Sequence, residues 1–288
     1  MKKTIFLFLL LQIVIGSAQS QRFLYEYKIA PDSTRRDSVI VEMMRLDVLP
    51  KGSKYYSQNV YMRDSIMDSR MKKNELVKNA DGGDMIISNE GTPHGVIEHK
   101  VYKTYPDFKI NFINKIWPDF YNQTDDRKIT WRILSDKQKI GKWDCQKAET
   151  NFAGRKWIAW FTSSIPIQDG PYKFRGLPGL IVKVTNQNET ISFELKGVQS
   201  IVKQNLDDDF EKQLNPIPVT YQQYVKLYKN YLKDPIAGLR KAYSDKVFEM
   251  YDASGNLMPQ EKVLKDYDTR AREQLKKNNN TLEPDLLK

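Results

Sequence analysis

Alternation between apolar and polar residues, the period of a β-strand, dominates the chain from residue 23 to residue 198. In residues 23–29, the large side chains of Phe23, Tyr25 and Tyr27 fall on every second position. From residue 96 onward such segments follow one another through short turns, which favours an antiparallel sheet that curves into a half-barrel, a sandwich or a barrel. We expect strands at residues 23–29, 39–49, 53–57, 96–105, 108–112, 129–133, 143–145, 156–162, 180–184 and 190–198.

Helical spacing of apolar residues replaces this alternation in other parts of the chain. Residues 59–78 show it through Met62, Ile66 and Met67, which predicts a helix packed on the sheet. Beyond residue 202 the same spacing predicts helices at 220–232 and 236–251. The sequence therefore predicts an α+β protein. Its expected parts are a signal peptide at 1–20, a β-rich domain at 21–202, a helical C-terminal appendage at 203–260 and a charged, flexible tail at 261–288.

The first twenty residues have the pattern of a secretory signal peptide. Lys2 and Lys3 precede an apolar run, and small residues lead to a cleavage site near Ser20. The run is too short to cross a bilayer, and no cysteine stands at the cleavage site to carry a lipid. We therefore expect a soluble protein in the periplasm or outside the cell, with neither a transmembrane helix nor a lipid anchor.

The net charge of the chain limits the kinds of molecule that it is expected to bind. The chain has 46 Lys and Arg against 36 Asp and Glu, which gives a net charge of +10. The excess is spread along the chain and accompanies no nucleic-acid-binding motif, so we expect no nucleic-acid partner and interpret it as a solubility feature. Peripheral contact with an anionic membrane surface is the alternative. Cys145 is the single cysteine, so burial of aromatic side chains must stabilise the core without an intramolecular disulfide.

Residues 165–184 are unusually rich in glycine, proline and apolar side chains. Pro178 and Gly179 occupy the central positions of a predicted type II turn. Residues 180–184 then read as a buried strand, because they are largely apolar and β-branched. Before the turn, Tyr172 and Phe174 alternate with charged residues, which predicts a half-buried extended segment.

The hexapeptide GLPGLI at residues 176–181 resembles the signature of the GLPGLI family of exported Bacteroidetes proteins. The resemblance extends over residues 129–185, through ITW at 129–131, FAGR at 152–155 and IPI at 165–167. It implies export to the envelope and a β-rich domain. Members are often encoded near outer-membrane TonB-dependent receptors, which implies an accessory role beside an outer-membrane protein. The family is chiefly known as uncharacterised, so the resemblance implies no reaction.

Two interpretations fit this stretch. In the first, it is a fold signature, a rigid turn that feeds a core strand and binds nothing. In the second, its aromatic residues line a groove, with an arginine at the rim and two tryptophans in support. The ligand-binding residues that the second interpretation predicts are Tyr172, Phe174, Arg175, Leu177, Trp157 and Trp160.

The sequence contains no paired carboxylates, zinc-ligand spacing or serine elbow. It therefore favours a non-enzymatic envelope module without a cofactor, which holds an apolar or peptide-like ligand or a membrane-protein partner. One alternative is a thiol-dependent enzyme that uses Cys145 with His94 or His99, the two histidines of the chain. The plain reading of Cys145 is a small buried apolar residue on a core strand.

A second alternative is a copper-handling protein. Soft thioether ligands suit Cu(I), and six of the methionines lie between residues 43 and 85. Their spacing also fits side chains that fill an irregular core between helix and sheet. These methionines are Met43, Met44, Met62, Met67, Met71 and Met85.

Overall fold

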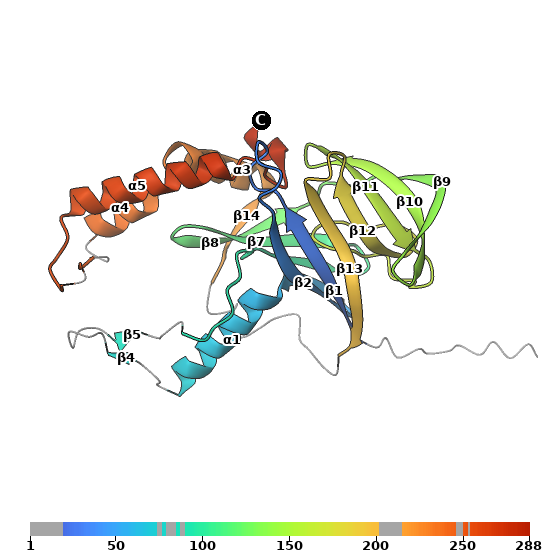
Figure 1. Cartoon of the computed structure of the whole chain (residues 1–288), viewed down its shortest axis with the longest axis horizontal. Coiled ribbons are helices and arrows are strands. Elements are labelled where there is room, and N and C mark those ends of the chain that lie inside the picture. Colours follow the sequence, from blue (N-terminus) through green and yellow to red (C-terminus); the bar gives the residue numbers. More distant parts are fainter. Residues whose placement is uncertain are drawn as a thin grey trace, which may run out of the picture.

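The computed structural model describes residues 20–73, 77–78, 85–86, 90–201, 215–245, 250–252 and 254–288. Within these residues, twelve strands form one open, curved sheet that is mainly antiparallel (Figure 1). Its order is β14-β8-β7-β6-β3-β2-β1-β13-β12-β11-β10-β9, and β14 runs parallel to β8. The strands are β1 (Gln21–Ile29), β2 (Ile40–Leu49), β3 (Gly52–Ser57), β6 (Lys100–Thr104), β7 (Lys109–Ile116), β8 (Asp119–Asp125), β9 (Arg132–Ile140), β10 (Trp143–Phe152), β11 (Arg155–Thr162), β12 (Leu180–Asn186), β13 (Ile191–Ser200) and β14 (Ile217–Thr220).

The alternation in the sequence sets which side chains face the hollow of this sheet. Along β1, Phe23, Tyr25 and Tyr27 are buried, while the residues between them are partly exposed. Because the sheet curves, the inward side chains of distant strands meet in one continuous core. The prediction of an α+β protein with a curved, mainly antiparallel sheet is confirmed, and the sheet is open, not a closed barrel.

The connection between β11 and β12 runs through the hollow of the sheet. We call residues 163–179 the interior segment. Its Tyr172 ring lies 6.0 Å from the ring of Phe112 on β7 and 6.4 Å from that of Phe193 on β13, so it bridges the two halves of the sheet. Phe174 packs edge-on against Trp157 of β11, at 4.8 Å between ring centroids. The interior segment therefore supplies the middle of the core.

The interior segment differs in conformation from the predicted extended segment and type II turn. Tyr172 has φ of 53°, in the left-handed region, and Lys173 is buried together with its aromatic neighbours. At the turn, the N–H of Gly179 donates to the carbonyl of Leu177 over 2.8 Å, which makes a three-residue turn. Gly179 has φ of 148°, and a Cβ there would clash with the carbonyl oxygen of Thr162. This position therefore requires glycine for both conformation and space.

The helices flank the sheet at two places (Figure 1). Helix α1 packs against β2 and β3 and begins where Ser57 Oγ accepts the N–H of Val60. It ends at Lys72, six residues before the predicted end, and residues 77–78 pair instead with β5. No helix within the described residues is long and apolar enough to span a membrane. The helices are α1 (Gln58–Lys72), α3 (Tyr221–Lys233), α4 (Ala237–Ser244), α5 (Gln260–Lys277) and the 3-10 turn η1 (Pro284–Leu287); β4 (Val77–Lys78) and β5 (Met85–Ile86) form a separate pair.

The C-terminal part of the chain differs from the flexible tail that we predict after residue 260. Residues 260–277 form α5, which packs beside α4, and the chain then returns to the end of the sheet (Figure 1). Asn280, Glu283 and Leu286 are buried there. Single buried residues in a charged segment leave no periodic pattern, so the sequence gives no sign that this segment is ordered by contacts with the sheet.

Candidate functional site

A cavity of about 910 Å³ opens at the end of the sheet where β1 begins and β2 ends. Its aromatic wall consists of Tyr105, Phe108 and Trp143, and the interior segment supplies residues 164–168. Among the described residues that line it, Lys142 is the one charged side chain. A concave, mainly apolar surface of this size is typical of a site for a small ligand or a short peptide.

The wall of the cavity is held in a fixed and strained shape. Phe108 has φ of 50°, which a residue with a Cβ adopts rarely and at some cost. Its ring lies 4.9 Å from that of Tyr105. The Tyr105 hydroxyl donates to Asp169 over 2.5 Å, and this bond ties the wall to a buried polar cluster behind it.

The cluster behind the wall centres on a fully buried ion pair between Lys103 and Asp169. The Asp169 carboxylate also accepts hydrogen bonds from Ser53 Oγ at 2.5 Å and from the N–H of Gly170 at 2.7 Å. The Lys103 ammonium also donates to the carbonyl of Gly170 over 2.6 Å. Burial lowers the pKa of Lys103, and the charge of Asp169 opposes that shift. The cluster thus anchors the middle of the interior segment, at Asp169 and Gly170, to β3 and β6.

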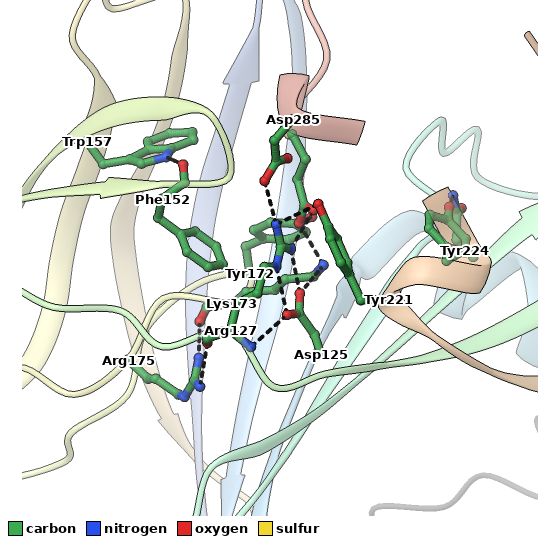
Figure 2. A network of polar contacts seen from close by, with 12 residues as sticks. Asp125, Arg127, Phe152, Trp157, Tyr172, Lys173, Arg175, Tyr221, Tyr224 and Asp285 are labelled. Carbon is green, nitrogen blue, oxygen red and sulfur yellow. Dashed lines mark hydrogen bonds and ion pairs between the residues drawn. The ribbon is translucent and has the colours of Figure 1, made fainter. Parts of the chain in front are cut away.

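A second buried network surrounds Lys173, four residues further along the interior segment (Figure 2). Lys173 is fully buried, and its ammonium pairs with Asp125 at 2.9 Å and with Glu283 at 2.6 Å. Arg127 contacts Asp125 at 2.6 Å and Glu283 at 2.7 Å, and its other terminal nitrogen contacts Asp285 at 2.8 Å. One fully buried cation, Lys173, and one partly buried cation, Arg127, are therefore matched by two buried carboxylates and one that is partly exposed.

Electrostatics inside this network favour the charged carboxylates. Burial alone would raise the pKa of Asp125, but the hydrogen bond from Arg127 and the charge of Lys173 outweigh it and hold that pKa well below its usual range. Glu283 follows the same balance, with burial opposed by Lys173 and Arg127 and a lowered pKa as the result. Nearby, burial first and the charge of Lys173 second lower the pKa of His99 to about 4.

The predicted ligand-binding residues do not line an open groove together in this structure. Tyr172, Phe174, Leu177 and Trp157 come together, but in the core, with exposed fractions of 3 % or less. They offer no surface to a ligand in this structure and instead pack the sheet. Phe174 lies at the centre of this group.

The other two predicted residues lie apart from that group. The Arg175 guanidinium donates to the carbonyl of Lys173 at 3.3 Å and is partly buried. Trp160 is half-buried, and the ammonium of Lys147 lies 5.9 Å from its ring. Neither residue lines the cavity beside Tyr105.

Sequence reasoning missed both the cavity and the two buried networks. Lys103 lies on a strand in which side chains alternate between the two faces, and a lysine in such a strand normally predicts the face exposed to solvent. Lys173 stands between two aromatic residues, which is the one local sign that its side chain is buried. Their partners Asp125, Asp169 and Glu283 are distant along the chain or lie in loops, so no spacing links them.

Cys145 and the two histidines have separate surroundings. Cys145 is buried on β10, its Sγ lies 3.5 Å from the carbonyl oxygen of Trp143, and burial raises its pKa to about 11. His94 is exposed, whereas the ring of His99 packs 5.4 Å from that of Phe112. Among the described residues no hydrogen bond joins the thiol to a histidine. At neutral pH such a thiol stays protonated and is a poor nucleophile.

The methionines do not form one group of ligands in the described part of the chain. Met44 is fully buried in the core, while Met43, its neighbour on β2, faces the other side of the sheet. The side chains of Met71 and Met85 lie outside the described residues. In the part of the chain that the structure describes, no three His, Cys, Asp or Glu side chains are arranged to hold a metal ion.

Comparison with known proteins gives a short family match and distant structural neighbours, two of which are described below. Residues 153–183 match the model of a family described as "Protein of unknown function (Porph_ging)". No curated protein matches the chain. The chain is similar to "Structure of PNGF-II in P21 space group" at 13 % identity and a TM-score of 0.46, over 73 % of this chain and 33 % of that one. It is similar to "Structure of PNGF-II in C2 space group" at 12 % identity and a TM-score of 0.47, over 73 % and 32 %. The chain thus spans about a third of the length of these structures.

Proposed function

We propose that this chain is an exported binding or accessory module without enzymatic activity, and that it holds an apolar or peptide-like ligand in the cavity walled by Tyr105, Phe108 and Trp143. The observation that carries the proposal is the wall itself. The cavity that it encloses is large, open and mainly apolar, and contacts with Tyr105 hold Phe108 in a strained backbone conformation. Strain of this kind persists where the surrounding structure fixes it, and it is concentrated at ligand sites.

The character of the nearby polar groups supports a role in holding and not in bond chemistry. The polar side chains directly behind the wall are Lys103, Asp169 and Ser53, and Asp169 pairs with Lys103 and accepts a hydrogen bond from Ser53. A nucleophile or general base needs a free lone pair directed at the substrate. In this cluster the lone pairs and protons are used to fix the wall.

The setting of the module is part of the same proposal. The match at residues 153–183 and the hexapeptide at 176–181 favour a GLPGLI-type protein, exported through a signal peptide to the periplasm or beyond. Such a protein would act beside an outer-membrane protein such as a TonB-dependent receptor, with peripheral membrane contact at most. The net positive charge of the chain is compatible with such contact.

The test measures binding of an apolar fluorescent probe, 1-anilinonaphthalene-8-sulfonate, and of hydrophobic tripeptides, with Trp143 as the intrinsic reporter. Phe108→Ala removes part of the wall, and Val198→Trp fills the cavity from a position that is 37 % exposed and tolerates a larger side chain. Each variant is expected to weaken binding by about 10-fold or more, since burying one aromatic ring contributes roughly 1.5–3 kcal/mol.

The control for this test is Trp117→Ala, an exposed aromatic residue that does not line the cavity. It should leave the affinity unchanged. Equal affinity in all three variants and the parent would place the probe elsewhere and remove the cavity as the site. Absence of binding by any apolar probe or tripeptide would count against the proposed function as a whole.

A further inference from the structure

The last residues of the chain lie on the end of the sheet in the manner of a bound peptide. We call residues 279–288 the strap. Asn280 enters a pocket in which its side-chain oxygen accepts a hydrogen bond from Arg155 at 2.7 Å and its amide nitrogen donates to the carbonyl of Ala30 at 2.7 Å. Its backbone N–H donates to the carbonyl of Pro31. The side chain and backbone of one strap residue are thus both recognised by the sheet.

Three residues further on, the strap inserts a carboxylate. Glu283 is 3 % exposed and accepts from the hydroxyl of Tyr172 at 2.6 Å as well as from Lys173 and Arg127. Leu286 then packs into the edge of the core. The strap is therefore bound through three side chains spaced three residues apart: the amide of Asn280, the carboxylate of Glu283 and the apolar side chain of Leu286. The polar groups that receive Asn280 and Glu283 belong to the sheet, its loops or the interior segment, and helix α3 also packs against η1.

Helix α5, which joins the strap to the rest of the chain, makes few buried contacts. Helix α5 packs beside α4 and buries only Val263 among its eighteen residues. The two helices project from the end of the sheet, away from most of its surface (Figure 1). At the connection between them Tyr251 and Leu257 are more than half exposed. The strap, and not α5, therefore holds the C-terminal part of the chain to the sheet.

We propose that the site formed by Arg127, Arg155, Tyr172 and Lys173 also accepts the strap of a second copy of this chain, so that two copies exchange α5 and the strap. We choose a second copy as the occupant because its residues 279–288 have the same sequence as the strap that already occupies the site. It can therefore form the same hydrogen bonds and ion pairs. Exchange requires that the bridge between Tyr251 and Leu257, which lies between α4 and α5, opens, and it leaves every buried charge paired.

Exchange competes with docking of the strap on its own sheet. A short tether gives the strap an effective local concentration in the millimolar range, so the monomer prevails in dilute solution. Exchange becomes visible at high protein concentration or when docking within one chain is blocked. An exchanged dimer also brings the exposed apolar residues of the connection, Tyr251 and Leu257, next to a second chain.

The first experiment blocks docking in each of two differently tagged chains. Glu283→Gln weakens a strap but keeps the receiving site, and Arg127→Met weakens a receiving site but keeps the strap. A 1:1 mixture at about 100 μM should form a heterodimer by light scattering, because the intact strap of one chain enters the intact site of the other. Each variant alone should remain mainly monomeric. Two unmixed monomers in the mixture would overturn the exchange.

A second experiment leaves the buried network intact. Ser33 lies next to Asn279, whose side-chain oxygen accepts its N–H at 2.9 Å, and both residues are exposed. In a Cys145→Ala background, one chain carries Ser33→Cys and the other Asn279→Cys. A short bis-maleimide should link the two chains after concentrated incubation, well above the link formed between Ser33→Cys and Lys137→Cys on β9. Equal yields would refute exchange.

A synthetic strap peptide separates the second copy from other acidic peptides. In excess, residues 279–288 should suppress the cross-link, and the same peptide with Gln at position 283 should suppress it less. If the peptide binds the Glu283→Gln chain while neither mixture gives a dimer, the site takes acidic peptides in general and the exchange is refuted. Because these readouts do not involve the cavity beside Phe108, they stand or fall independently of the proposed function.

Discussion

Replacing Glu283 with glutamine is the sharpest test of the buried network around Lys173. The change conserves size and leaves the buried Lys173 and the partly buried Arg127 with one carboxylate fewer. Removing one partner of a buried ion pair typically costs about 3–5 kcal/mol, because the remaining charge is left uncompensated. The glutamine oxygen still accepts one hydrogen bond, and Asp125 still pairs with both cations. We therefore expect the lower end, a loss of about 3 kcal/mol in the free energy of unfolding.

Urea unfolding followed by tryptophan fluorescence measures this loss, and a thermal scan should show a decrease of roughly 6–12 °C in Tm for a chain of this size. The matched control is Glu273→Gln on the exposed face of α5, which should change stability by less than about 0.5 kcal/mol. Adding Lys173→Met to Glu283→Gln should restore part of the loss, since removing both partners of a buried pair is often close to neutral. Equal midpoints for Glu283→Gln and its control would refute the reasoning.

Three further predictions concern single residues. The pKa of His99, lowered to about 4, means that the folded state favours the neutral ring, so stability present above pH 6.5 falls by up to about 3 kcal/mol as the pH drops towards 4; His99→Phe should flatten that dependence in urea titrations, and an unchanged slope would contradict it. Gly179→Ala should lower Tm by calorimetry through a loss of more than about 2 kcal/mol, because its Cβ would clash with Thr162; a stable variant would show that the turn adapts. Cys145, with a pKa raised to about 11, should react with a thiol reagent at pH 7 about ten times more slowly than in the unfolded chain; rapid labelling of the native protein would favour thiol chemistry instead.

The sheet follows from the sequence because its cause is local. Along β1, Phe23, Tyr25 and Tyr27 fall on one face of a strand, and the same alternation recurs in neighbouring strands, so the fold class needs no knowledge of partners. Helix α1 shows the limit of this reasoning. Its predicted end at residue 78 depends on continued spacing, whereas the helix stops at Lys72. Ends depend on contacts and caps more than on periodicity.

The candidate site could not be derived in the same way because its causes are distant in sequence. Lys173 is buried only because Asp125, 48 residues earlier, and Glu283, in the strap, come to it. Neither carboxylate has a local pattern that distinguishes it from a surface acid. The cavity wall has the same origin, since Phe108 and Trp143 meet only after the sheet curves. Aromatic residues at 172–177 suggested a groove, but aromatic content alone does not tell a core from a surface.

Filling the hollow of the sheet with the interior segment has a consequence for how such proteins diversify. In a curved sheet whose hollow is empty, the side chains that would contact a ligand are the same ones that form the core. Here residues 169–179 of the chain already fill the hollow, so under the proposed function the ligand would be selected at the cavity beside Phe108, outside the core. Substitutions in the wall of that cavity would then change ligand preference and leave the packing of the interior segment intact.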